Sequence, residues 1–197
     1  IKLFPVVLAP ALLLWQRRSG DGRPWRDSLF GAAVVAVGTA PFLLVGAQGL
    51  WNMLHYHLAR PLQIESTGAS YLLGLSALSD RGRQVSTSYG SQNLVGTGPD
   101  VITAISTGLQ LALVATVAVV LARRLREADT AGAPRVFVAA VATTLAGMLA
   151  TGKFFSSHFL VRLLPACVLF APPRRRSALL ATAGAMVVTQ LYFPYRY

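Results

Sequence analysis

The stretch VITAISTGLQLALVATVAVVLA, residues 101–122, contains 22 residues and no charged side chain, and it ends at Arg123 and Arg124. A helix needs about 20 predominantly apolar residues to cross the hydrocarbon of a bilayer. The stretch therefore predicts a transmembrane helix that ends at a basic loop. The composition agrees, because 54% of the chain is hydrophobic, 13% is charged and the mean hydropathy is +0.54. A soluble domain carries about 25% charged residues.

Five other apolar stretches resemble this one, and they are separated by polar or basic segments. They are residues 3–15, 29–50, 136–151, 159–171 and 178–193. We expect the first to be the remainder of a span that begins upstream. The predicted fold class is all-α, a polytopic transmembrane helix bundle of about six spans. A long outer loop, residues 51–100, completes the prediction.

Arginine clusters set the predicted orientation of these spans. The clusters are Arg17, Arg18, Arg23 and Arg26; Arg123, Arg124, Arg126 and Arg135; and Arg174, Arg175 and Arg176. Loops rich in Lys and Arg stay on the cytoplasmic side, and with all three clusters there the six spans alternate without conflict. Because the basic residues flank spans and do not form one soluble face, we expect membrane lipids and not nucleic acid as partners. The preference for Arg, Ala, Val and Gly suggests a high-GC bacterium, and hence a multi-pass protein of a bacterial plasma membrane.

The predicted outer loop falls into two parts. Residues 66–78 are apolar enough for a short helix lying along the membrane interface. Residues 79–100 are polar and rich in Gly and Ser. There Val85, Thr87 and Tyr89 alternate before Gly90, a pattern that fits either a small β-hairpin or a flexible loop.

The first candidate site follows the second span, where His57, Arg60 and Glu65 lie close together in the sequence. The guanidinium of Arg60 can bind a phosphate or a carboxylate through two hydrogen bonds, and Glu65 can hold it or accept a hydroxyl. The spacing matches no common metal motif, so no metal is expected. The alternative is an interfacial loop whose polar groups meet only water and headgroups.

The second candidate site follows the fourth span and contains Lys153, His158 and Arg162. Lys153 can neutralise a phosphate as a point charge, or it can simply extend from a helix end to the headgroup layer. Arg162 lies about one turn inside the fifth span, where a guanidinium is expected to face the bundle or a wet cavity. Both lysines, Lys2 and Lys153, fall on the predicted outer side. With Arg60 and Arg162 they are predicted to line one outward-facing anion pocket.

Four pieces of this chain, in order, resemble the C-terminal half of bacterial GT-C glycosyltransferases, most closely the family 87 polyprenol-phosphate-mannose-dependent mannosyltransferases. The pieces are Lys2-Leu3-Phe4-Pro5, Tyr56-His57-x-x-Arg60-Pro61-Leu62-Gln63-Ile64-Glu65-Ser66, Gly152-Lys153-Phe154-Phe155-Ser156 and Thr189-Gln190-Leu191-Tyr192-Phe193-Pro194. The family commonly has Ser-Pro-Gln-Tyr where this chain has Ser156-Ser157-His158-Phe159. That departure leaves the role of His158 open.

The resemblance implies that residues 1–197 are the C-terminal part of one transmembrane GT-C-like domain. Such hexosyltransferases move a sugar, here expected to be mannose, from a polyprenyl-phosphate carrier to a lipid-linked or cell-envelope glycan acceptor at the outer face. They use no further cofactor, and their general base lies upstream of Ile1, so we expect this segment alone to be inactive. Lys2, His57, Arg60, Glu65, Lys153, His158 and Arg162 would contact the donor phosphate or the substrates. The alternatives are a transporter or flippase of lipid-linked glycans and a membrane scaffold.

Overall fold

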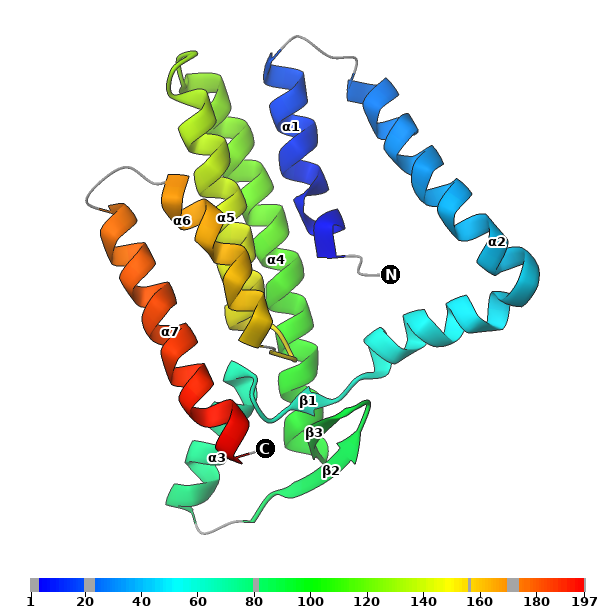
Figure 1. Ribbon diagram of the computed structural model, residues 1–197, viewed down its shortest axis with the longest axis vertical. Coiled ribbons are helices and arrows are strands. Elements are labelled where there is room, and N and C mark those ends of the chain that lie inside the picture. Colours follow the sequence, from blue (N-terminus) through cyan, green and yellow to red (C-terminus); the bar gives the residue numbers. More distant parts are fainter. Residues whose placement is uncertain (1–3, 20–23, 80–81, 156, 170–173, 197) are drawn as a thin grey trace.

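The computed structural model describes residues 4–19, 24–79, 82–155, 157–169 and 174–196. It is mostly helical, with a small sheet at one end of the helices (Figure 1). The helices are η1 (Phe4–Leu8), α1 (Ala9–Ser19), α2 (Pro24–Ala59), α3 (Thr67–Leu78), α4 (Thr97–Glu127), α5 (Ala133–Thr151), η2 (Ser157–Leu163), α6 (Leu164–Leu169) and α7 (Arg174–Arg196). The strands are β1 (Leu62–Gln63), β2 (Gln84–Ser88) and β3 (Ser91–Val95).

Three helices are long and apolar enough to cross a membrane. These are the part of α2 over Trp25–Gly49, together with α4 and α5. The other expected spans are helical in the described residues, but α1 is short, and the fifth stretch is divided between η2 and α6. Pro165 is the second residue of α6, a position that proline tolerates because the first-turn N–H groups have no partner within the helix. Three helices of the chain could thus cross a membrane, which is consistent with a helical membrane protein, and the count of six spans stays a prediction.

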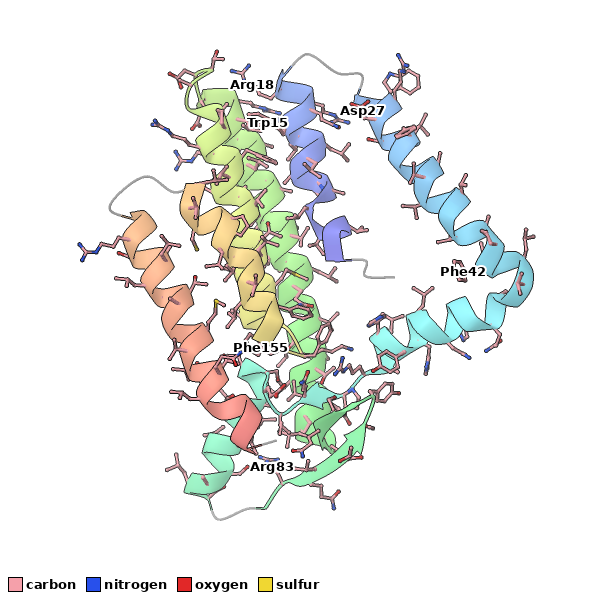
Figure 2. The ribbon with its side chains drawn as sticks, in the orientation of Figure 1. Trp15, Arg18, Asp27, Phe42, Arg83 and Phe155 are labelled. Carbon is pink, nitrogen blue, oxygen red and sulfur yellow. The ribbon has the colours of Figure 1, made fainter. Side chains whose placement is uncertain are left out.

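The arginine-bearing ends of α1, α2, α4 and α5 lie toward the top of Figure 1, whereas that of α7 lies lower, at the left. Arg18, labelled in Figure 2, connects two of the clusters. Its Nε donates to the carbonyl of Leu125 (3.1 Å), and its Nη2 donates to the carbonyl of Ala128 (3.2 Å). The last carbonyls of a helix find no N–H donor within the helix, and they attract cations. Arg18 therefore stabilises the end of α4.

The centre of the bundle is the antiparallel pair α4 and α5, against which α1 packs (Figure 1). Leu121 and Leu125 of α4 are buried with alanines of α1 and α5, and the rings of Trp15 and Phe137 lie 5.0 Å apart. Gly147 lets the helices approach closely, since an added Cβ would lie 2.4 Å from a methyl carbon of Leu113. Small residues commonly permit such close packing in membranes.

Helix α2 differs from the others, because it leans away from the bundle and bends (Figure 1). No residue of its most apolar stretch is buried in the protein. The bend is at Gly46, whose φ of −169° and ψ of 71° are not helical. Pro41, which lies within α2, is about one turn earlier. The helix continues to Ala59, so residues 51–59, which we had placed in the outer loop, are helical.

The rest of the predicted outer loop contains α3 and an antiparallel sheet of order β1-β3-β2, which is an addition to the all-α prediction. Tyr89 and Gly90 join β2 to β3 with φ of 55° and 66°. Positive φ at both central residues is what a type I′ hairpin turn requires. Of the two alternatives for residues 79–100, the hairpin is therefore the observed one. Helix α3 begins after Ser66, whose Oγ accepts a hydrogen bond from the N–H of Ala69 (3.2 Å); the position of α3 at a membrane interface stays a prediction.

Candidate functional site

Two cations that are far apart in the sequence, Arg60 and Lys153, lie close together at the end of the bundle opposite the arginine clusters. Arg60 follows the last residue of α2, and Lys153 lies in the turn after α5. The backbone joins these segments directly, because the N–H of Gln63 in β1 donates to the carbonyl of Lys153 (2.9 Å). The sheet therefore attaches the end of α2 to the end of α5.

Lys153 is held by burial and by one strong hydrogen bond. Only 9% of the residue is exposed, and its Nζ donates to the carbonyl of Leu58 in the last turn of α2 (2.7 Å). Burial lowers the pKa of Lys153, and the positive charge of Arg60 lowers it further. Both effects are expected when a cation loses water and meets a like charge. Lys153 thus caps α2 in this structure, which is a structural role in its own right.

Arg60 is half-buried and is held on two sides. Its Nη2 donates to Ser91 Oγ (2.9 Å), and its guanidinium carbon lies 5.2 Å from the centre of the Phe154 ring. A cation over an aromatic face is attracted by the ring quadrupole. The Nε of Arg60 is buried and has no hydrogen-bond partner in the described structure. An unsatisfied buried donor costs about 1–3 kcal/mol, so this N–H gains from any acceptor that reaches it.

The partner of Arg60, Ser91, belongs to a polar network in the sheet. Its Oγ lies 3.1 Å from Oδ1 of Asn93, whose side chain is fully buried. The Nδ2 of Asn93 in turn donates to the carbonyl of Ser88 (2.7 Å). Buried polar groups are stable only when they are hydrogen-bonded, and here that requirement fixes the position of Ser91 and, through it, of Arg60.

Gly152 sets the path of the turn that carries Lys153. A Cβ at this position would lie 2.9 Å from the carbonyl oxygen of Met148 and 3.0 Å from that of Phe154. Both are backbone atoms, which cannot move aside as a flexible side chain can. The nearby Gln110 of α4 donates from Nε2 to the same Met148 carbonyl (3.3 Å), so α4 also supports this turn.

The other predicted residues are placed differently. Glu65 is half-buried and accepts a hydrogen bond from Nε2 of Gln63, while His57 is exposed and its ring stacks edge-on with Tyr56 at 5.4 Å. Lys2 lies outside the described residues. His158 and Arg162 belong to η2, but the structure describes only their backbone and not their side chains. The structure therefore brings together Arg60 and Lys153 from the predicted set.

Sequence reasoning did not select Ser91 and Phe154 as partners of Arg60, nor the Leu58 carbonyl as the partner of Lys153. Phe154 had a signal, since it follows Lys153 directly in a motif that we had singled out. Ser91 had only its place after the Tyr89-Gly90 turn. Every residue has a backbone carbonyl, so the sequence does not indicate which one Lys153 contacts, and only the structure shows it.

The electrostatics of the site favour an anion. Within the described part of the chain, neither Arg60 nor Lys153 forms an ion pair with a carboxylate. The same part of the chain contains no group of three or more His, Cys, Asp and Glu that could hold a metal ion. Two adjacent cations with spare donor capacity match the chemistry of a phosphate or carboxylate ligand.

Comparison of the chain with protein-family models, with curated proteins and with solved structures found no match.

Proposed function

We propose that this chain is part of a membrane glycosyltransferase that moves a sugar from a polyprenyl-phosphate carrier to a hydroxyl of a lipid-linked or cell-envelope glycan at the outer face. The expected sugar is mannose, following the resemblance described above. Arg60 and Lys153 would bind the phosphate of the donor. The proposal rests chiefly on one observation, the pairing of these two cations beside the ends of α2 and α5.

The pairing suits a departing phosphate for a physical reason. Arg60 lowers the pKa of Lys153, so the two charges repel each other in the free protein. An anion bound by both would remove that repulsion and accept from the unpartnered Nε of Arg60. Fixed cations aimed at developing negative charge stabilise a transition state more than they stabilise the substrate.

The proposed reaction is a displacement at the anomeric carbon of the sugar. The acceptor hydroxyl oxygen forms a bond to that carbon, while the bond from the carbon to the phosphate oxygen breaks. The hydroxyl proton goes to a general base, which the resemblance places upstream of Ile1. The electron pair of the broken bond stays on the phosphate, and polyprenyl phosphate leaves beside Arg60 and Lys153. Glu65 and His57 would contact the sugar or the acceptor.

The experiment that tests this proposal supplies the full-length protein, in vesicles, with a polyprenyl-phosphate-linked hexose and an acceptor glycolipid. We expect polyprenyl phosphate to be released in an amount equal to the sugar transferred. Movement of the intact donor between leaflets, without release, would contradict a transferase and support a transporter of lipid-linked glycans. Neither release nor movement would support a scaffold.

A further inference from the structure

The part of α2 that follows the bend, residues 47–59, has two chemically different sides. Trp51, Leu54 and Leu58 are spaced i, i+3 and i+7 and so share one side of the helix. Gln48, Asn52 and His55 are spaced i, i+4 and i+7 and share another. The amide of Gln48 donates to Oδ1 of Asn52 (2.9 Å), as neighbours on one side of a helix can.

Most of the apolar side of this part of the helix is not covered by the protein, although Leu54 is half-buried. Trp51 is 59% exposed and Leu58 is 75% exposed. The preceding part of α2 is different, because large apolar residues such as Phe30, Val37 and Leu44 are exposed there without a polar side opposite them. A helix that is apolar all round fits the hydrocarbon of a bilayer, whereas a two-sided helix with Trp and Leu on one side fits its boundary with water.

The bend changes the direction of the helix as the composition changes. Gly46 has non-helical backbone angles, and after it the helix runs obliquely back toward β1 at the lower end of the bundle, not along the bundle axis (Figure 1). The far end is fixed at two points. Tyr56 Oη donates to the carbonyl of Tyr89 in the hairpin (2.5 Å), and Lys153 Nζ donates to the carbonyl of Leu58 (2.7 Å).

We propose that residues 47–59 form an in-plane helix that binds the lipid surface at the outer boundary of the bilayer. Trp51, Leu54 and Leu58 would enter the boundary between headgroups and acyl chains, and Gln48 and Asn52 would face water. Lipid is the occupant because this helix continues directly from the membrane-spanning part of α2, so the bilayer is already adjacent to its first residue. Tryptophan is also enriched at this depth.

One consequence concerns the candidate site, although the inference does not depend on sugar transfer. The chain leaves the helix at Arg60, directly after residue 59. An in-plane helix would therefore hold Arg60 at the depth of the lipid headgroups. A phosphate carried by a membrane lipid would reach Arg60 without leaving the bilayer.

Site-directed spin labelling tests the proposal in the full-length protein, with native cysteines such as Cys167 replaced by serine. Single cysteines at positions 48, 51, 52, 54, 55 and 58 are labelled, and the protein is placed in phosphatidylcholine vesicles. Accessibility to oxygen, which concentrates in lipid, is compared with accessibility to a water-soluble nickel chelate. Val37→Cys, in the apolar part of α2, is the control for a site inside the hydrocarbon.

We expect the ratio of oxygen to nickel accessibility to be several-fold higher at positions 51, 54 and 58 than at positions 48, 52 and 55, with the values repeating at the helical period. A steady change along the helix would mean that it crosses the bilayer and would overturn the proposal. High nickel accessibility at all six positions, or low accessibility to both reagents, would also overturn it, since either result excludes contact with lipid. If the protein labelled at position 51 fails to fold, Trp51→Phe is combined with a label at each of the other five positions in turn. This conservative variant should retain the pattern at those positions.

Discussion

Replacing Gly147 with alanine should destabilise the protein through one identifiable contact. Gly147 lies on α5 where it meets α4, and a Cβ there would be 2.4, 2.9 and 3.2 Å from the last three carbons of the Leu113 side chain. Ordinary contact begins near 3.4 Å, so the leucine or the helices must move. Overpacking of this kind costs about 1–3 kcal/mol. We expect the free energy of unfolding to fall by about that amount for Gly147→Ala.

A double-mutant cycle with Leu113→Ala assigns the loss to this contact. In the Leu113→Ala background the added methyl group has room, so Gly147→Ala should be neutral or stabilising by up to about 1 kcal/mol, the helix propensity difference between Gly and Ala. Gly108→Ala is the matched control, since nothing lies within 4 Å of a Cβ at that helical glycine. Unfolding by sodium dodecyl sulfate in mixed micelles measures the four proteins of the cycle and the control. An equal loss for Gly147→Ala in both backgrounds would refute the packing of α4 on α5 described above.

Three further outcomes are expected. Gly152→Ala should lower stability by about 1–3 kcal/mol, because its Cβ would meet two backbone carbonyl oxygens at 2.9 and 3.0 Å, and thermal unfolding in detergent would show it. Lys153 has a pKa lowered from 10.5 by burial and by Arg60, so the folded protein binds fewer protons than the unfolded chain between those pKa values. The cost of keeping Lys153 charged in the folded protein is full below the folded pKa and is relieved as pH rises toward 10.5. The free energy of unfolding should therefore increase with pH in that window. Measured by unfolding at a series of pH values, this increase should be smaller in Lys153→Met. Tyr56→Phe, which removes the hydrogen bond to Tyr89, should cost about 0.5–1 kcal/mol and should speed amide hydrogen exchange in the hairpin; unchanged exchange would contradict the anchoring role.

Hydropathy predicted the three helices that are long and apolar enough to cross a membrane, but not their ends. The expected span 101–122 lies inside α4, which runs from Thr97 to Glu127, and the expected span 29–50 lies inside α2, which continues to Ala59. Apolar content measures the part of a helix that suits hydrocarbon, whereas the backbone stays helical until a cap or a proline stops it. For α2 the difference matters, since the extension carries Trp51 and ends beside the candidate site.

The sheet and the site contacts depended on tertiary structure. Alternation at Val85, Thr87 and Tyr89 indicated a hairpin, but β1 has only two residues and pairs with β3 across a long separation, so no local pattern reveals it. The predicted topology put Arg60 and Lys153 on the same side of the membrane. Their proximity, however, depends on the bond between Gln63 and the Lys153 carbonyl and on the burial of Leu62 and Leu94 beneath the sheet, and neither is visible in the sequence.

The most direct test of the proposed phosphate site is the rate of polyprenyl phosphate release by the full-length Arg60→Gln/Lys153→Met double variant. The control is Arg83→Gln, which alters an exposed arginine (Figure 2) that donates a hydrogen bond to Ser76 and lies outside the proposed site. Thermal unfolding first establishes that each variant is folded. We expect a loss of at least about 100-fold for the double variant and little change for the control, since removing one transition-state donor costs about that much. A folded double variant that releases polyprenyl phosphate at the wild-type rate would contradict the assignment of Arg60 and Lys153 to the donor phosphate.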